Sequence, residues 1–303
     1  MKKILFLILI INSFNSNAQK KSLTKTEAPK TDHGYTIGQI DKNYGAFVNF
    51  HSDTMNKDFP MLVFLPNGYK ESKKEFPVIY SLHGYNNAKL TEDGLRAMML
   101  PETGCQEAAN EYQVIIVCPL VGNHYYIDSP IYKERKFATL IGVELVRFVE
   151  QRYRAIKDRK YRILQGFSMG GYGAVSLLCR YPETFSTALS RGGALFQQAL
   201  IDDLNWDDAS LESLGDFFEN PKIYHQHSIV NLLNKIKERT DVAIVLEVGR
   251  EDFLYTGNQK VNEKLKTCKF PFIFAEYPGG HVWSKNALHS MLVHLQYFVK
   301  TKN

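Results

Sequence analysis

Short apolar runs alternate with helical patterns along most of the chain. Strand-forming residues gather in eight segments that carry few or no charges. These predicted strands are residues 46–50, 61–65, 78–82, 114–118, 161–165, 187–190, 242–248 and 272–277. Strands that are almost continuously apolar are typical of a parallel sheet covered by helices on both faces. The pattern therefore predicts an α/β protein with a mainly parallel central sheet.

Helical patterns fill the intervals between the later strands. Apolar residues recur at helical spacing within residues 137–153. Further helices are predicted over residues 174–180, which Pro182 ends, and over residues 283–300. The first two or three strands are joined by short turns and are expected to be antiparallel. Residues 196–237 break the rhythm with acidic, aromatic and helical pieces, so we expect a small cap over a pocket there.

The N-terminus differs from the rest of the chain. Lys2 and Lys3 precede an apolar run that is too short to span a bilayer, so residues 1–18 are interpreted as a secretory signal peptide. Residues 19–33 have little to bury, which predicts a disordered tether. Residues 34–303 form one domain in this interpretation. We expect a secreted or periplasmic protein without stable membrane insertion after signal cleavage.

Composition and charge narrow the choice of partner. Of the 303 residues, 44% are hydrophobic and 23% are charged, which excludes a disordered or multi-spanning chain. The 37 basic and 32 acidic residues give a net charge of +5, and no long basic run is present in the sequence. Nucleic acid is therefore not an expected partner. The sequence does not indicate an oligomeric state.

The four cysteines are Cys105, Cys118, Cys179 and Cys268. Export would permit disulfides between them. However, Cys118 ends an apolar run and Cys179 follows two leucines in a predicted helix, so both resemble small buried hydrophobic residues. Free buried thiols are expected, with disulfides as the alternative, and the spacing does not suggest a metal site.

The strongest chemical signal is residues 166–170, which read GFSMG between a predicted strand and a predicted helix. This setting is the one required for a nucleophile elbow. The turn holds Ser168 in a strained backbone conformation, and a side chain at Gly166 or Gly170 would collide with neighbouring backbone. Ser168 is therefore the candidate nucleophile.

A serine hydroxyl is a poor nucleophile unless a base takes its proton. Among nine histidines, His281 is the best placed because its loop follows the last strand and precedes the C-terminal helix. His289 and His294 lie within that helix, and His225 and His227 lie in the predicted cap. His281 is therefore the candidate base.

The base needs a carboxylate that holds its tautomer and stabilises the imidazolium. Asp252 lies in the loop after the seventh predicted strand, at the same edge of the sheet as the elbow. Its neighbour Glu251 is the main alternative, and Glu247, inside the strand, is less suited. The chain order Ser168, Asp252, His281 is the order found in α/β-hydrolases.

The tetrahedral intermediate needs hydrogen-bond donors for its oxyanion, and backbone N–H groups can provide them. One is expected from Met169, directly after the nucleophile. The other is expected from Tyr85, because residues 81–85 (SLHGY) leave a strand beside the elbow. His83 is interpreted as a residue that shapes this loop.

Five segments share a pattern with known proteins: LHG at 82–84, GNHYYIDSP at 122–130, GFSMGGYGA at 166–174, EDFLY at 251–255 and GHVW at 280–283. Together they resemble the esterase family of α/β-hydrolases that includes esterase D, tributyrin esterase, feruloyl and acetylxylan esterases and mycolyltransferases. The resemblance covers about residues 60–300. It implies an α/β-hydrolase fold, Ser168, Asp252 and His281 as the catalytic triad, and no cofactor or metal.

Two positions depart from this family pattern. Arg191 is unusual in the loop that follows the sixth predicted strand, and Asn286 stands where an aromatic residue is frequent. Both departures bear on the preference for acyl and leaving groups.

These observations predict an exported serine carboxylesterase that hydrolyses short-chain acyl or carbohydrate-linked acetyl or feruloyl esters through an acyl-enzyme. Tyr125, Tyr126, Trp206 and Trp283 are candidate pocket residues for an aromatic acyl group or a sugar, with packing as the alternative. A small-molecule or polysaccharide-linked ester is the expected partner. Two other functions remain open: acyl transfer to a sugar or alcohol, and carbohydrate binding without catalysis.

Overall fold

The computed structural model describes residues 46–85, 104–195, 213–216, 219–284 and 286–300. The predicted signal peptide and tether lie outside the described residues, as does the first part of the predicted cap, residues 196–212. Within these ranges, none of the helices combines the length and the apolar character needed to cross a membrane.

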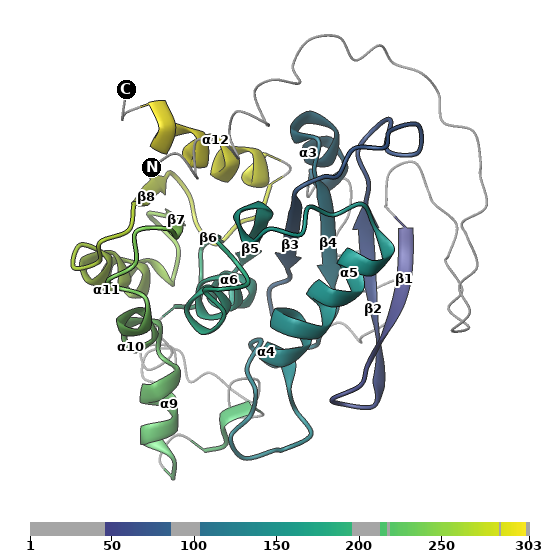
Figure 1. Ribbon diagram of the computed structural model, residues 1–303. Coiled ribbons are helices and arrows are strands. Elements are labelled where there is room, and N and C mark those ends of the chain that lie inside the picture. Colours follow the sequence, from purple (N-terminus) through teal and green to yellow (C-terminus); the bar gives the residue numbers. More distant parts are fainter. Residues whose placement is uncertain (1–45, 86–103, 196–212, 217–218, 285, 301–303) are drawn as a thin grey trace.

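An eight-stranded sheet runs through the centre of the molecule (Figure 1). The strands are β1 (Ala46–Ser52), β2 (Lys57–Phe64), β3 (Val78–Leu82), β4 (Ile115–Pro119), β5 (Arg162–Phe167), β6 (Thr187–Arg191), β7 (Ala243–Gly249) and β8 (Phe272–Tyr277). Their order across the sheet is β1-β2-β4-β3-β5-β6-β7-β8. All eight predicted strands are present, and the predicted α/β-hydrolase architecture is confirmed.

The antiparallel part of the sheet is confined to one side. β2 pairs antiparallel with both β1 and β4, whereas every pair from β4 through β8 is parallel. The expected antiparallel arrangement is confirmed for β1 and β2. β3 also runs opposite to β2, but it pairs with β4 and β5 and not with β2. The chain between β3 and β4 passes through helix α3 (Cys105–Tyr112) and returns to the same end of the sheet, which makes the two strands parallel.

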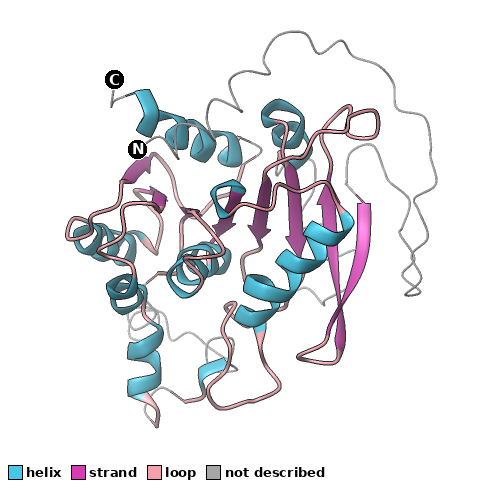
Figure 2. Cartoon of the chain, in the orientation of Figure 1, coloured by secondary structure: helices cyan, strands magenta, loops and turns pink. Residues whose placement is uncertain are grey.

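Helices cover both faces of the sheet (Figure 2). Successive strand residues point to opposite faces, so Val78 and Tyr80 of β3 belong to one apolar core and Ile79 belongs to the other. The core that contains Ile79 is closed by α3 and α12 (Ala287–Lys300). The other core is closed by α4 (Phe137–Thr139), η2 (Leu140–Leu145), α5 (Val146–Arg152), α6 (Met169–Arg180), α9 (Pro221–His227), α10 (Ile229–Leu232), η4 (Leu233–Lys235) and α11 (Tyr255–Leu265).

The three predicted helices are present, and two of them begin elsewhere than expected. The helix over residues 137–153 is one continuous run of α4, η2 and α5, with a π-helical middle. α6 begins at Met169, because the turn at Ser168 leads directly into the helix. α12 begins at Ala287, not at residue 283, because the chain before it is a loop in which the Val282 carbonyl accepts a hydrogen bond from a side chain of β6.

The described end of the predicted cap packs on the helix that follows Ser168. α9, α10 and η4 lie between residues 219 and 237. The Tyr172 hydroxyl of α6 donates to the His227 carbonyl over 2.7 Å. Burial lowers the pKa of the His227 imidazole to about 4. This stretch is therefore joined to α6 by buried contacts.

All four cysteines are thiols in this structure. Cys105, Cys118 and Cys179 are buried and Cys268 is half-buried. Burial raises the pKa of the Cys179 thiol to about 12. The predicted burial of Cys118 and Cys179 is confirmed.

Candidate active site

Ser168 stands in a strained turn between β5 and α6. Its backbone has φ 57° and ψ −120°, a conformation that residues with a side chain seldom adopt. A Cβ atom at Gly166 would lie 2.3 Å from the Gly170 backbone, and one at Gly170 would lie 2.0 Å from the Leu82 carbonyl. Both positions therefore require glycine, as the sequence predicted, and the close approach presses the turn against the end of β3.

The backbone around Ser168 is fixed by hydrogen bonds to the next strand. The Ser168 N–H donates to the Arg191 carbonyl over 3.0 Å, and the Ser168 carbonyl accepts from the Ala194 N–H over 3.0 Å. Ser168 is 6% exposed. A strained conformation persists only where its surroundings hold it in this way.

Asp252 and His281 are joined directly. Nδ1 of His281 donates to Asp252 Oδ2 over 2.9 Å and lies 3.1 Å from Oδ1. The Asp252 carboxylate is fully buried and also accepts the Leu254 N–H over 2.8 Å. The sequence named both residues, and the structure brings them together from the loops after β7 and β8.

The His281 imidazole lies between two aromatic rings. Phe167, which precedes Ser168, stacks on it with centroids 4.4 Å apart and planes inclined by 29°. The Phe253 ring lies 4.6 Å away on a tilted plane. These contacts fix the ring plane, and sequence reasoning missed both of them. The available signal was their position beside Ser168 and Asp252.

Ser168 and His281 are linked through Phe167 and Gly192. A Cβ at Gly192 would lie 2.7 Å from Asp252 Oδ2 and 3.2 Å from His281 Nδ1, so this glycine packs against the pair. Within the described chain, the Ser168 hydroxyl and the His281 ring do not form a direct hydrogen bond. Such bonds often shorten only when substrate is bound.

Two other carboxylates were candidates to pair with the base, and neither contacts it. Glu251 is exposed, and within the described residues the carboxylate that pairs with His281 is that of Asp252, not that of Glu251. Glu247 is 1% exposed and pairs with Arg191 of the neighbouring strand. Asp252 is therefore the carboxylate that contacts the candidate base.

The predicted oxyanion segment lies against the nucleophile turn. A Cβ at Gly84 would lie 3.3 Å from Ser168 Cβ, which places Tyr85 one residue beyond this contact, while Met169 begins α6. His83 shapes the segment: its Nδ1–H donates to the Gly84 carbonyl over 2.8 Å, and its Nε2 accepts the Val121 N–H over 3.2 Å. Burial lowers the pKa of His83 to about 4, so the ring is neutral at pH 7.

The predicted pocket aromatics differ in their surroundings. Tyr125 and Tyr126 are 1% and 0% exposed and belong to the core beside α6. The Tyr126 hydroxyl donates to the His83 carbonyl over 2.9 Å, so this ring supports the oxyanion segment from behind. Trp283 is half-buried, with its ring 5.8 Å from the Phe167 ring. Trp206 lies outside the described residues.

Comparison with known proteins gives one consistent answer. The family model described as "Putative esterase" matches residues 52–294. An acetyl esterase of Caldicellulosiruptor saccharolyticus is 26% identical over 250 residues, which is 78% of this chain and 91% of that protein.

Solved structures agree with the family match. The fluorophosphonate-binding serine hydrolase F of Staphylococcus aureus is similar with a TM-score of 0.66 and 23% identity, over 82% of this chain and 97% of the other. A ferulic acid esterase is similar with a TM-score of 0.63 and 25% identity, over 83% and 95% of the two chains. The likeness to the serine hydrolase, at 23% identity, shows a shared fold and no more than that.

Proposed function

Because the chain belongs to this esterase family of α/β-hydrolases and is a serine carboxylic ester hydrolase, we propose that Ser168 is its nucleophile, His281 its general base and Asp252 the carboxylate that orients the base. The observation that carries the proposal is the strained Ser168 turn packed, through Phe167 and Gly192, against the hydrogen-bonded Asp252–His281 pair.

The chemistry follows from these contacts. Since Nδ1–H of His281 is held by Asp252, Nε2 carries the lone pair that takes the Ser168 proton during attack on the acyl carbon. The protonated ring then gives this proton to the leaving alkoxide, and water releases the acyl group by the same steps in reverse order. Proton transfer of this kind contributes about 10² to 10⁴ in rate.

The negative charge that develops on the substrate oxygen needs donors next to Ser168. The backbone N–H groups of Met169 and Tyr85 are proposed for this role, and the contact between Gly84 and Ser168 supports the placement of the second. Each such donor is worth about 10² to 10³ in kcat. The neutral His83 ring keeps the Tyr85 segment in shape without adding a charge.

For the substrate, we propose short-chain acyl esters and carbohydrate-linked acetyl or feruloyl esters. The acetyl esterase relative and the ferulic acid esterase structure support this range. Trp283, beside Phe167 and half-buried, is the aromatic residue that we assign to the acyl pocket. Residues 1–18 are proposed to direct export, which would bring the enzyme to acylated polysaccharides outside the cytoplasm. Mass spectrometry of the protein recovered from cell fractions would test cleavage after Ala18.

The decisive test replaces the nucleophile. Ser168→Ala should abolish hydrolysis of p-nitrophenyl acetate and labelling by a fluorophosphonate probe, while circular dichroism and thermal unfolding stay unchanged. The matched control is Ser176→Ala in α6, the helix that follows Ser168. Its hydroxyl is also buried and, among the described residues, donates to the Gly173 carbonyl alone. Turnover retained in Ser168→Ala, or labelling lost in Ser176→Ala, would contradict the assignment.

The substrate range is tested by a panel of acetyl, butyryl, octanoyl and feruloyl esters, including acetylated xylan. A tenfold preference for acetyl or feruloyl esters over octanoyl esters would support the proposal. The same reactions with an added sugar or alcohol acceptor reveal acyl transfer as a transesterified product. A protein that binds these esters without turnover or labelling would be a binding module.

A further inference from the structure

Four residues stand side by side in one row at the carboxyl edge of the sheet. The strand register pairs Phe167 with Arg191, Arg191 with Glu247, and Glu247 with Ala275. Residues paired in this way point to the same face, and for this row it is the face covered by α12. The first member stacks on His281. One end of the row, Phe167, therefore contacts the proposed base.

Arg191 connects this row to the loop that carries His281. Its Nε–H donates to the Val282 carbonyl over 3.2 Å, one residue beyond the base. Its guanidinium lies 3.8 Å from the Tyr277 ring centroid, at the start of the same loop. Its own carbonyl accepts the Ser168 N–H. One residue thus contacts the nucleophile turn through its backbone and the base loop through its side chain.

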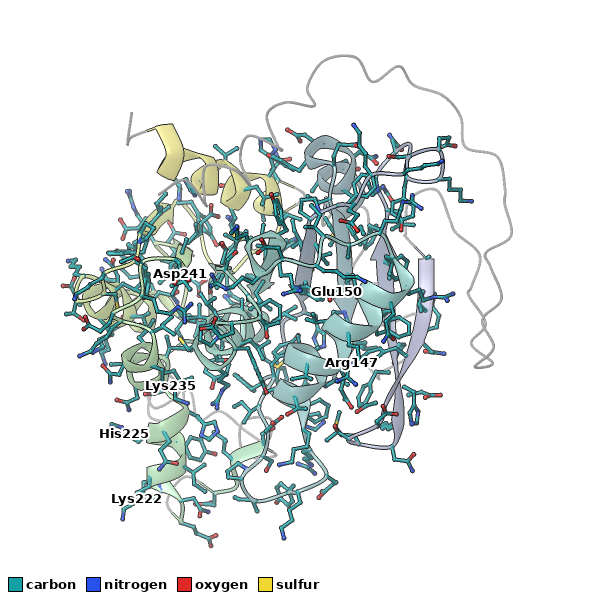
Figure 3. The ribbon with its side chains drawn as sticks, viewed as in Figure 1. Arg147, Glu150, Lys222, His225, Lys235 and Asp241 are labelled. Carbon is teal, nitrogen blue, oxygen red and sulfur yellow. The ribbon has the colours of Figure 1, made fainter. Side chains whose placement is uncertain are left out.

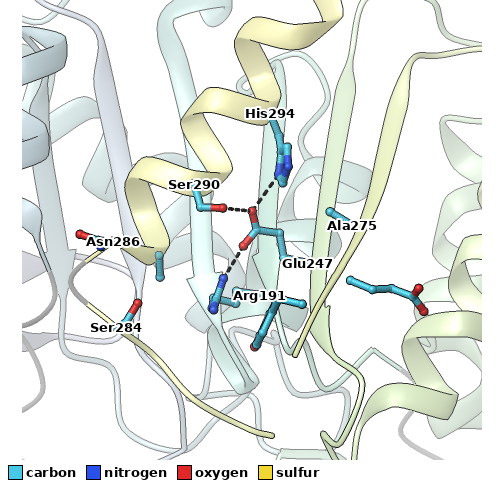
Figure 4. A pocket seen from close by; sticks show the side chains of 10 residues that line it. Arg191, Glu247, Ala275, Ser284, Asn286, Ser290 and His294 are labelled. Carbon is cyan, nitrogen blue, oxygen red and sulfur yellow. Dashed lines mark hydrogen bonds and ion pairs between the residues drawn. The ribbon is translucent and has the colours of Figure 1, made fainter. Parts of the chain in front are cut away.

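Glu247 holds the Arg191 side chain in this position. Its carboxylate is 2% exposed and is paired with the Arg191 guanidinium (Figure 4). The second carboxylate oxygen accepts the Ser290 hydroxyl over 2.8 Å and lies 2.8 Å from Nδ1 of His294, both on α12. A buried carboxylate is tolerated only when its partners compensate the loss of water.

Gly192, the residue after Arg191, connects the backbone of Glu247 to the Asp252–His281 pair. Gly192 donates its N–H to the Glu247 carbonyl over 2.7 Å. The same glycine, at φ +49°, packs against Asp252 and His281. Movement of the Arg191–Glu247 pair would therefore displace the surface on which the Asp252–His281 pair rests.

Hydrogen bonds to backbone carbonyls hold the loop between β8 and α12 at both ends and, through Arg191, near its middle. The Gly279 carbonyl accepts from the Glu251 N–H, and the Ser284 carbonyl accepts from the Ala287 N–H. Between them, the Val282 carbonyl is held by Arg191. The base sits next to the middle anchor, so its position depends on that side chain.

We propose that Arg191, held by Glu247, is a positioning residue for His281: it fixes the carbonyl that follows the base and so keeps the imidazole directed at the nucleophile turn. This inference rests on the proposed role of His281. It also gives a role to Arg191, one of the two departures from the family pattern. Asn286, the other departure, lines the same pocket of about 360 Å³ as the pair. Arg191 lies under the base loop and is assigned to orientation, not to contact with the acyl group.

The chain offers a matched control for this arginine. Arg162, at the other end of the sheet, also pairs with a glutamate, Glu150, and also donates to a backbone carbonyl, that of Thr184. Replacement of either arginine removes one charge of a shielded pair and one bond to a carbonyl. Only Arg191 is connected to the base.

The test compares Arg191→Met and Arg191→Lys with Arg162→Met and Arg162→Lys. A base displaced by a fraction of an ångström lowers kcat, so Arg191→Met should lose ~10- to ~100-fold in kcat with KM within about twofold. Arg191→Lys should show a smaller loss of kcat. Its ammonium group keeps the ion pair with Glu247 but cannot donate to the Val282 carbonyl at the same time, as the planar guanidinium does. Both Arg162 variants should stay within about twofold of the native kcat.

Hydrogen exchange supplies a readout that does not depend on esterase activity. Amides in the peptide over residues 278–284 should exchange faster in Arg191→Met than in Arg162→Met. If exchange rises but the native protein shows no Ser168-dependent turnover, the anchoring of the loop stands and the proposed function fails. If turnover depends on Ser168 but exchange and kcat of the Arg191 variants match the Arg162 controls, the positioning role is overturned.

A second variant keeps the proposal testable if Arg191→Met does not fold. Loss of one partner from a buried pair is strongly destabilising, so Arg191→Met is accompanied by Glu247→Gln, which keeps the size and the hydrogen-bonding oxygen. Glu247→Gln should fold, lower kcat by ~3- to ~10-fold and leave KM within about twofold. A loss that appears only in KM would contradict the role of the pair.

Discussion

The two ends of the parallel sheet each contain an arginine–glutamate pair. At the amino end, Arg162 begins β5 and pairs with Glu150, which Figure 3 labels on α5. At the carboxyl end, Arg191 ends β6 and pairs with Glu247 of β7. Side chains of the first pair are 12% and 17% exposed, and those of the second are 9% and 2% exposed. The carboxyl-end glutamate therefore depends almost wholly on protein partners.

The backbone that each arginine holds is also different. Arg162 donates to the Thr184 carbonyl, in the reversal that joins α6 to β6. Arg191 donates to the Val282 carbonyl, next to the proposed base. Connections at the amino end return the chain to the sheet, and connections at the carboxyl end carry the proposed reactive groups, as in open α/β sheets generally. We therefore expect the two ion pairs to affect different properties: the Arg162 pair the stability of the fold, and the Arg191 pair the position of the proposed base.

The largest expected effect is at the carboxyl end, in the carboxylate that touches the base. Asp252→Asn should lower kcat by about 10³ to 10⁴, because the amide no longer fixes the His281 tautomer or stabilises the imidazolium. Hydrolysis of p-nitrophenyl acetate measures it. Glu251→Gln, one residue earlier and exposed, is the control and should be close to native. Equal losses in the two variants would remove Asp252 from the triad.

The second prediction compares one glycine from each end. Gly170→Ala should lower the free energy of unfolding by about 4 kcal/mol, since its Cβ would meet the Leu82 carbonyl at 2.0 Å. Gly68, in the turn after β2 at the amino end, has φ +76°, and a Cβ added there would meet nothing within 4 Å, so Gly68→Ala should lose only about 1 kcal/mol. Urea unfolding measures both, and similar losses would contradict the close approach at Gly170.

The two ends should also respond to acid in different pH ranges. The pKa of His83 is lowered by burial from 6.5 to about 4, so between these values the unfolded chain binds a proton that the folded chain does not. The free energy of unfolding should therefore fall as the pH drops from 6.5 to 4, by up to ~3 kcal/mol for this group. At the amino end, the hydrogen bond from Arg239 lowers the pKa of Asp241 from 3.8. Its contribution is present above that value and is lost only at lower pH.

Urea unfolding at pH 7.5, 5.5 and 4.5 separates these ranges. His83→Gln should show a shallower loss over this interval than the native protein, and the control His51→Gln, at an exposed position, should not. If the native protein and His83→Gln lose stability in parallel, His83 is not the acid-sensitive group.

The smallest expected effect is at the amino-end pair. Arg162→Met should lower the free energy of unfolding by about 2 kcal/mol, because Glu150 and the Thr184 carbonyl both lose their donor. Lys266→Met, which breaks an exposed pair with Glu263, should change it by less than about 0.5 kcal/mol. Thermal and urea unfolding measure both, and a drop in kcat for Arg162→Met would erase the contrast between the two ends.

Most of the sheet could be predicted from the sequence. Five of the eight strands, β3 to β7, have buried or nearly buried residues on both faces, and a continuous apolar run such as residues 114–118 leaves little choice of structure. β2 starts four residues earlier than predicted, at Lys57, because pairing with β1 recruits polar residues that the pattern does not select. Pairing partners follow from the tertiary fold, which is why the position of β4 between β2 and β3 was not predicted.

Helices that touch the core through few residues were not predicted. α11 buries only Asn258, Val261 and Leu265 among its eleven residues, so its sequence looks polar. α3 is short and its buried positions include two alanines, which carry little periodic signal. The cap prediction covers residues that the structure describes only in part, and it stays a prediction.

The candidate site divides in the same way. Ser168, Asp252 and His281 each follow a strand end, so chain order and loop position were enough to name them. The Arg191–Glu247 pair could not be named, because its partners are 56 residues apart and meet only through the strand register. A signal was nevertheless present, since Glu247 stands inside an otherwise apolar strand and a buried charge needs a partner.

The place of α12 has a consequence for when the protein becomes active. Ser290 and His294 of α12 complete the shell around Glu247. Synthesis proceeds from the N-terminus, so the elbow emerges first, the carboxylate and base follow, and α12 emerges after all three. A chain that stops before this helix, or one in which the helix cannot dock, would contain every proposed reacting group and still turn over slowly.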